Sequence, residues 1–307
     1  MTASVRLSRQ IGILMIAPDS LALLPTAPLL VFGGPYSNLQ AMQALLAEAA
    51  RLGISGDRIV CTGDIVAYGA DPAACCDLAM ASGMHVLMGN CEQNLAAGSA
   101  DCGCGFDEGT ECDRLSSAWY AYAAGQISSA HQQFMAACPQ RITIGLPDGR
   151  RLAVIHGGAS DISRFLFAST DDAVLADEIA DTGCDGVIAG HCGIPFVREV
   201  GAGLWLNAGA IGMPAHDGTP RVWFSVLTLE PDGLRVDIRP LSYDQAGAAA
   251  AMRAARLPEG YAAGLETGLW PSEDVLPPAE KASRGVPLQP VTHLWRAEVA
   301  TRRSGTG

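Results

Sequence analysis

The chain has 307 residues, 49% of them hydrophobic and 17% charged, which is enough for one large domain with a sizeable core. Its formal net charge is −12 and Lys281 is its only lysine, which argues against binding to nucleic acid or to an anionic membrane. The ten cysteines are clustered rather than spread as a disulfide framework, so we expect most to be reduced in a cytoplasmic protein. The apolar segment 11–17 is too short to span a membrane.

Apolar runs alternate with helical patterns in the first third of the chain. Residues 29–32 end at two glycines and predict an inner strand, and Asn38 can cap a helix that Gly53 ends. A strand at 58–61, a helix at 72–82 and a strand at 85–88 are expected next. This alternation predicts a partly parallel sheet with helical cover.

From residue 91 to 138 the alternation stops, and a Cys-rich stretch is followed by helical patterns. A hairpin is then expected, with its turn at 147–149. The remaining expected elements are a helix at 171–181 and strands at 186–189, 204–206, 222–229 and 234–240. We therefore divide the chain into an N-terminal extension (1–27), a main domain (28–242) with an insertion (91–138), and a helical, Pro-rich tail (243–307). The tail is expected to pack on the body through Trp270, Leu276 and Trp295.

Four metal-capable residues stand at expected strand ends. They are Asp64 in VCTGD, Asn90 in VLMGN, His156 in AVIH and His191 in VIAGH. Strand ends of an α/β sheet converge on one edge, so these side chains are expected to meet. A single Gly-Asp turn or a single histidine is usually structural, but four in this order indicate a metal site. Two imidazoles, one carboxylate and one amide oxygen suit Zn, Mn or Fe.

With these residues the sequence resembles the calcineurin-like metallophosphoesterases. That family has Asp-x-His, Gly-Asp, Gly-Asn-His, His and Gly-His-x-His motifs, each at a strand end. The resemblance spans roughly residues 28–242 and includes GDIVAYGADP and LNAGAIG. It implies an α/β fold in which two sheets form a sandwich with helices on the outer faces, extended here by the Cys-rich insertion and the tail. It also implies a dinuclear metal centre that hydrolyses phosphoesters.

The first metal position of the family is altered in this sequence. Gly34 stands where the family has Asp, Tyr36 where it has His, and Gly193 where it has the final His. Of the ligands that the resemblance implies for that metal, only the bridging Asp64 remains. The second set, Asp64 with Asn90, His156 and His191, is complete. A single bound metal is therefore expected.

Several further residues are candidates for substrate contact or proton transfer. Gly34 would allow a substrate to approach the backbone, and Tyr36 could be a phenolate ligand, a hydrogen-bond donor or a wall. Arg164 is either an anion clamp or a surface arginine, and Asn207 is expected at the rim. Cys91 replaces the histidine that follows Asn in the family, and could act as general acid or as an extra ligand.

The remaining candidates are one carboxylate and a cysteine cluster. Glu92 is the alternative acid or base beside Cys91. Cys102, Cys104 and Cys112 could hold a metal or form a redox-active cluster, but their Cys-x-Cys spacing is unusual for a zinc site. Unpaired thiols or an oxidised pair are the alternatives.

The sequence thus favours a metal-dependent hydrolase that acts on a small phosphorylated metabolite, without nucleic-acid or membrane partners. One alternative is a metal-binding sensor or scaffold without hydrolase activity. Another is a mononuclear iron enzyme with a different reaction. The sequence leaves open whether the chain forms a homo-oligomer.

Overall fold

The structure, a computed structural model, describes residues 20–23, 26–105 and 109–297. Its strands form two mixed sheets, which confirms the expected α/β sandwich. The first sheet has the order β1-β5-β6-β7-β9-β8. Its strands are β1 (Ser20–Ala22), β5 (Ile142–Gly145), β6 (Arg151–Val154), β7 (Gly186–Ala189), β9 (Gly203–Asn207) and β8 (Phe196–Val200). The apolar segment 11–17 lies outside the described residues.

The second sheet has the order β12-β11-β10-β2-β3-β4. Its strands are β12 (Val291–Arg296), β11 (Gly233–Leu241), β10 (Val222–Glu230), β2 (Leu29–Phe32), β3 (Ile59–Cys61) and β4 (His85–Val86). Strands β2, β3 and β4 run parallel, whereas β10, β11 and β12 are antiparallel to their neighbours. Strand β12 comes from the Pro-rich tail, so the tail completes this sheet.

Alternating side chains of the buried strands build the layers of the core. In β2, Leu29 and Val31 face the first sheet, while Leu30 and Phe32 face the helices on the outside. This period of two is what a strand covered on both faces requires. All four side chains are at most 1% exposed, so the strand reads as a continuous apolar run.

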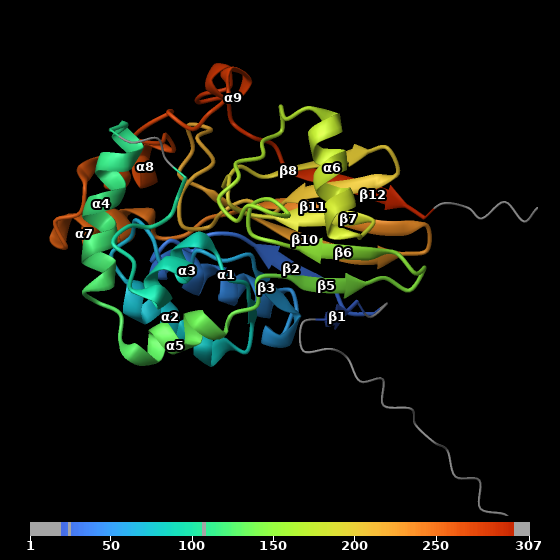
Figure 1. The fold of residues 1–307 in the computed structure, drawn as a ribbon, viewed down its shortest axis with the longest axis horizontal. Helices are drawn as coiled ribbons and strands as arrows, with labels where there is room; N and C mark the ends of the chain where they lie inside the picture. Colours follow the sequence, from blue (N-terminus) through green and yellow to red (C-terminus); the bar gives the residue numbers. More distant parts are fainter. Residues whose placement is uncertain (1–19, 24–25, 106–108, 298–307) are drawn as a thin grey trace, which may run out of the picture.

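Helices cover the outer faces of both sheets. Figure 1 shows α6 lying across the first sheet, with most of the other helices on the opposite side of the molecule. The helices are α1 (Leu39–Arg51), α2 (Pro72–Ser82), α3 (Asn90–Ala97), α4 (Glu111–Ala124), α5 (Ser129–Ala137), α6 (Asp172–Thr182), α7 (Gln245–Ala254), α8 (Glu259–Thr267) and α9 (Pro278–Ala282). No helix in the described part of the chain is long and apolar enough to cross a membrane.

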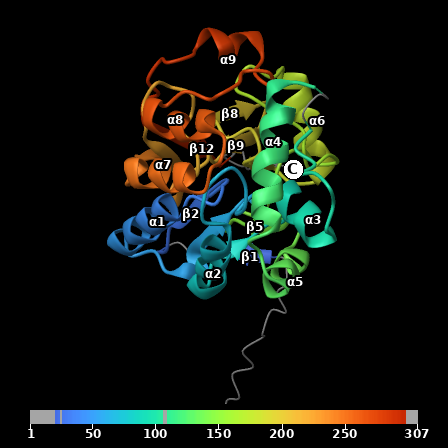
Figure 2. The same ribbon diagram turned by 90° about the vertical axis from the view of Figure 1, so that its left-hand side faces the viewer.

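The tail packs on the body over its described length. Helix α7 lies beside α1, far away in the sequence (Figure 2). Leu276 and Trp295 are 4% and 2% exposed, and the Trp270 indole Nε1 donates a hydrogen bond to the Pro214 carbonyl at 2.6 Å. The expected docking of these three side chains is therefore present.

Candidate metal centre

Four side chains converge on one point at the carboxyl ends of strands from both sheets. Asp64 follows β3, Asn90 begins α3 after β4, His156 follows β6, and His191 follows β7. The Nε2 atom of His156 lies 3.2 Å from Asp64 Oδ2, 3.1 Å from Asn90 Oδ1 and 3.0 Å from His191 Nδ1. All four side chains are buried. The structure thus brings together the whole expected ligand set.

The hydrogen bond of the His156 imidazole to the backbone leaves its other ring nitrogen facing the polar atoms of the site. His156 Nδ1 lies 2.7 Å from the Thr62 carbonyl oxygen, which can only accept, so Nδ1 carries the hydrogen. In the neutral ring, Nε2 then presents a lone pair to two oxygens. His191 is neutral, since burial and the neighbouring His156 lower its pKa to about 3.

Protonation of His156 does not resolve this arrangement. Burial disfavours the charged ring, but the Asp64 carboxylate outweighs it and raises the pKa of His156. The added hydrogen on His156 Nε2 can be donated to only one of the three polar atoms that surround this nitrogen. A divalent cation satisfies all of them at once, and the Thr62 carbonyl orients the ring as outer hydrogen bonds do in metal sites. The residues present therefore fit a transition metal.

The loop that carries Asp64 is held by Glu92. The Glu92 carboxylate accepts hydrogen bonds from the backbone N–H groups of Asp64, Ile65 and Gly89 at 2.6, 2.7 and 2.9 Å. Asp64 has a left-handed backbone, with φ of 58°, which such contacts stabilise. Because all these donors are backbone groups and the side chain is fully buried, Glu92 positions the Asp64 loop. Burial, followed by the charge of Asp64, raises the pKa of Glu92 to about 7, and its acid–base role stays a prediction.

Cys91 lies behind the ligands rather than in the pocket beside them. Its backbone N–H donates to Asp64 Oδ1 at 3.2 Å, and its thiol lies 3.6 Å from the Asn90 amide nitrogen. Burial, followed by the charge of Asp64, raises the pKa of the thiol well above its usual range. The geometry gives no support to Cys91 as an acid that contacts a substrate or as a thiolate ligand.

Tyr36 fills the space beside Asp64 where the sequence lacks the other ligands. A Cβ atom added to Gly34 would lie 2.1 Å from the Tyr36 ring, and one added to Gly193 would lie 3.6 Å from the hydroxyl. The ring is 6% exposed. Burial, reinforced by Asp64, raises the pKa of Tyr36 well above 10, so the side chain is a neutral phenol and not a phenolate ligand.

The cysteine cluster does not form a metal site. Cys102 and Cys104 are joined by a disulfide, while Cys112 is a free, half-buried thiol in α4. In the described part of the chain, Asp64, His156 and His191 are the only group of three acidic, histidine or cysteine residues close enough to share an ion. The structure therefore favours the alternative of an oxidised pair with an unpaired third thiol.

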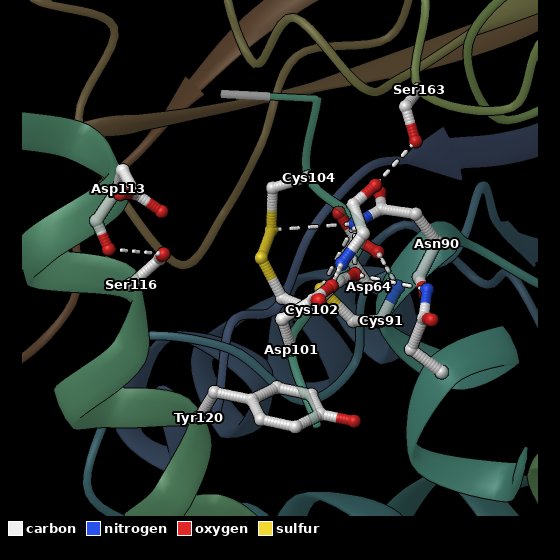
Figure 3. Close-up of a disulfide and its surroundings, with 12 residues drawn as sticks. Asp64, Asn90, Cys91, Asp101, Cys102, Cys104, Asp113, Ser116, Tyr120 and Ser163 are labelled. Atoms are coloured by element: carbon white, nitrogen blue, oxygen red, sulfur yellow. Dashed lines mark hydrogen bonds between the residues drawn. A yellow bond between two sulfur atoms is a disulfide. The ribbon is translucent and has the colours of Figure 1, made fainter. Parts of the chain in front are cut away.

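The turn closed by the Cys102–Cys104 disulfide (the disulfide turn) orients the candidate ligand Asn90 (Figure 3). The Asn90 Nδ2 atom donates to the Cys102 carbonyl at 3.0 Å and to Cys104 Sγ at 3.4 Å. Ser163 in turn donates its hydroxyl to the Gly103 carbonyl at 2.6 Å. With its nitrogen held in this way, the amide presents Oδ1 to His156.

Two expected substrate contacts lie elsewhere. Arg164 forms an ion pair with the buried carboxylate of Glu178, so it is not free to clamp an anion. Asn207 donates to Cys192 Sγ and accepts from the Gly209 N–H, each at 3.1 Å. The amide of Asn207 is therefore used within the fold and does not line the pocket.

An apolar pocket opens beside Asp64 and His191, and sequence reasoning missed most of its wall. Aromatic side chains from four separate segments line it: Tyr68, Phe165, Tyr261 and Trp270. Phe165 packs on the His191 ring, with centroids 4.3 Å apart. Only Tyr68 stood in a recognised motif, the YG of GDIVAYG. The others carry no local signal, because they reach the pocket through tertiary packing.

Two solved structures share this fold. A metallophosphoesterase from Sphaerobacter thermophilus is 25% identical, with a TM-score of 0.62 over 79% of this chain and 99% of its own. A hypothetical protein from Pyrococcus horikoshii is 16% identical, with a TM-score of 0.65 over 80% and 99%. An uncharacterized protein of Methanocaldococcus jannaschii is 24% identical in sequence, over 73% of this chain and 91% of its own.

The family match falls on the segment that carries the site. Residues 37–232 match the profile of the calcineurin-like phosphoesterase superfamily domain, a range that includes all four converging side chains. Together with the two-sheet fold and the geometry at His156, this match confirms the expected family. The chain belongs to the calcineurin-like phosphoesterase superfamily.

Proposed function

We propose that the protein is a phosphoesterase that uses one divalent transition metal, Zn, Mn or Fe, to hydrolyse a small phosphorylated molecule. The observation that carries the proposal is the His156 Nε2 atom, which faces Asp64 Oδ2, Asn90 Oδ1 and His191 Nδ1 within 3.2 Å. Such convergence of acceptors in a buried site is costly unless a cation is present. The family supplies the reaction class.

A single metal is favoured because Tyr36 occupies the neighbouring space. A second ion there would have Asp64 as its only charged ligand, and one carboxylate is too few to hold a divalent ion against water. The ring of Tyr36 also stands where side chains at positions 34 and 193 would have to reach. The protein is thus proposed to work without the two-sided clamp of dinuclear phosphoesterases.

The surrounding residues would prepare the reaction. A bound divalent ion would act as a Lewis acid and lower the pKa of water from about 15.7 towards 7. The backbone carbonyls of Thr62 and Cys102 would fix the geometry of the ligands His156 and Asn90 through the contacts described above. Tyr36 lines the pocket beside Asp64 and keeps its proton, so it can donate a hydrogen bond to a substrate oxygen. Eight of the ten cysteines are free thiols, and on that ground we also propose a cytoplasmic setting, in which the Cys102–Cys104 disulfide would be unusual.

Elemental analysis and a hydrolysis assay test the proposal together. Protein purified in air without chelator should contain about one equivalent of Zn, Mn or Fe, and should hydrolyse p-nitrophenyl phosphate or its diester. The His191→Ala variant should lose both properties. The matched control is His131→Ala, since His131 is also buried but pairs with Asp77 outside the site.

Three results would contradict the proposal. Metal binding without hydrolysis would indicate a sensor or scaffold. Activity that depends on iron and on oxidation state, without phosphoester cleavage, would indicate another reaction. Full hydrolytic activity in His191→Ala would place the chemistry elsewhere in the molecule.

A further inference from the structure

The Cys102–Cys104 disulfide is the exception among the ten cysteines of the chain. The other eight are free thiols, and even the neighbours Cys75 and Cys76 are unlinked. In a reducing compartment, a disulfide is usually transient and takes part in catalysis or redox sensing. The cytoplasmic setting proposed above therefore favours a pair that opens and closes over a permanent cross-link.

The disulfide adds little through the loop that it closes. The two cysteines are only 2 positions apart in the sequence, and a cross-link lowers the entropy of the unfolded chain less when the loop is shorter. Gly103 between them has a left-handed backbone, with φ of 60°, which a glycine adopts without strain. The disulfide is therefore better explained by the shape of the turn than by the stability of the fold.

The disulfide turn contacts Asn90 at both of its ends. The Asn90 Nδ2 atom donates to the Cys102 carbonyl at 3.0 Å and to Cys104 Sγ at 3.4 Å (Figure 3). Reduction would release the Cys104 sulfur from Cys102 and let its side chain rotate, so the contact with the sulfur would no longer be fixed. The reduced turn would therefore hold the Asn90 amide less firmly.

Other contacts would keep the turn in place while the disulfide is open. Asn94 Nδ2 donates to the Cys102 carbonyl at 3.2 Å, and the Ser163 hydroxyl donates to the Gly103 carbonyl at 2.6 Å. These two hydrogen bonds do not involve sulfur, so reduction leaves their donors and acceptors unchanged. We therefore expect a partial loss of order at Asn90 rather than local unfolding, as a reversible switch requires.

One of the two bonded cysteines lies where a small molecule can reach it. Cys104 lines the apolar pocket of the candidate metal centre, whereas Cys102 is not among the described residues that line it. Cys192 also lines the pocket, but its sulfur accepts a hydrogen bond from Asn207 and lies 3.6 Å from the Ile194 carbonyl oxygen. Cys104 is therefore the sulfur at which exchange would begin.

We propose that Cys104 is a thiol-exchange site at which a small-molecule thiol opens the disulfide and loosens the hold on Asn90; its effect on the metal rests on the proposed function. The sulfur of the first thiol bonds to Cys104 Sγ, the bond to Cys102 breaks, and the thiol proton passes to Cys102 Sγ. A second thiol attacks the sulfur of the attached molecule and leaves Cys104 as a thiol. The protein disulfide gains two electrons, which the two small thiols supply as they form their own disulfide.

Exchange at Cys104 is tested with 2-hydroxyethyl disulfide and a matched pair of variants. Cys112 also lines the pocket as a free thiol, so Cys112→Ser is present in both. Cys102→Ser/Cys112→Ser retains Cys104, which should take up one hydroxyethylthio group in the folded protein, located by peptide mass spectrometry. Cys104→Ser/Cys112→Ser retains Cys102, which should react at least about tenfold more slowly because it does not line the pocket.

The effect on the metal centre is tested by the affinity for manganese in the two oxidation states. Manganese prefers oxygen ligands to thiols, so the newly freed cysteines do not compete for it. The wild-type protein is oxidised with 2-hydroxyethyl disulfide or reduced with excess 2-mercaptoethanol, and the reagent is removed under argon. Paramagnetic resonance of the free ion should give a dissociation constant about tenfold higher for the reduced protein, and reoxidation should restore it. Cys102→Ser/Cys104→Ser should give the same constant after either treatment.

The outcomes separate this proposal from the proposed function. Labelling of Cys104 that is no faster than labelling of Cys102 overturns the exchange site. Equal manganese affinity of the oxidised and reduced wild-type protein overturns the switch, while the proposed single-metal hydrolase stands. A wild-type protein that binds no manganese, zinc or iron refutes the proposed function, and the labelling of Cys104 and Cys102 still decides whether the exchange site exists.

Discussion

Replacement of His156 by alanine should cost most of the metal affinity. Four protein ligands in a structural zinc site together supply about 10–16 kcal/mol, so one ligand contributes about 2.5–4 kcal/mol. At about 1.4 kcal/mol for each factor of ten, the dissociation constant of His156→Ala should rise about 100- to 1,000-fold. His156 is the apt position because its Nε2 is the atom around which Asp64, Asn90 and His191 gather.

Chelator competition and thermal unfolding measure this loss independently. For the wild-type protein, metal at about 100 times its dissociation constant should add about 2.7 kcal/mol of stability and raise Tm by about 4 °C. The same metal concentration should barely shift Tm of His156→Ala, while His131→Ala should respond like the wild type. A dissociation constant within tenfold of wild type in His156→Ala would refute the assigned centre. Two equivalents in the wild type would refute the single site.

Four more outcomes are expected. Tyr36→Phe should leave metal content unchanged by elemental analysis and at most slow turnover, because Tyr36 is not a ligand. The double variant Cys102→Ser/Cys104→Ser should bind metal about tenfold more weakly in chelator competition, since the disulfide turn orients Asn90. Cys112→Ser is the control and should bind metal like the wild type. Equal affinity in the wild type, the double variant and Cys112→Ser would show that the turn does not orient Asn90. Truncation after residue 244 should lower the free energy of unfolding in urea by more than about 4 kcal/mol, the cost of deleting one buried tryptophan such as Trp295; undiminished stability would contradict the packing of the tail. Burial lowers the pKa of His216. Its contribution to stability is therefore present above the unfolded pKa of about 6.5 and is lost as the pH falls below that value. The free energy of unfolding should consequently fall less steeply between about pH 7 and 5 in His216→Gln than in the wild type.

The four converging side chains of the candidate metal centre were predictable because each stands at a strand end that the apolar pattern marks. The run at 186–189 predicts β7 (Gly186–Ala189) with its observed bounds, and His191 follows two residues later. The carboxyl ends of parallel strands lie at the same edge of a sheet, so residues that directly follow such strands are expected together at that edge. The same reasoning identified Asp64, Asn90 and His156.

The edge strands were not predictable in this way. Strand β12 (Val291–Arg296) follows Pro287 and Pro290, and only Trp295 of its residues is buried. Strand β8 (Phe196–Val200) is likewise buried only at its two ends. A strand that pairs along one side needs no continuous apolar run, so its sequence resembles a loop.

The roles of individual polar groups were also beyond the sequence. Glu92 stands next to the expected catalytic position, but its direction depends on backbone N–H groups that the fold brings from residues 64, 65 and 89. Cys-x-Cys spacing does not distinguish a disulfide from a metal-binding pair. Arg164 could be assigned only once Glu178 of α6 was seen beside it.

If the site holds one metal, as proposed, the ring of Tyr36 makes any change to a two-metal site depend on the order of mutations. A carboxylate cannot be restored at position 34 while Tyr36 stands, because even its Cβ atom would lie 2.1 Å from the ring. A histidine at position 193 would need a left-handed backbone, with φ of 70°, and its Cβ atom would lie 3.6 Å from the hydroxyl of the same residue. Tyr36 must therefore change first, and that change alone leaves an unfilled space without completing a ligand set. One side chain therefore protects the proposed single-metal arrangement against stepwise change.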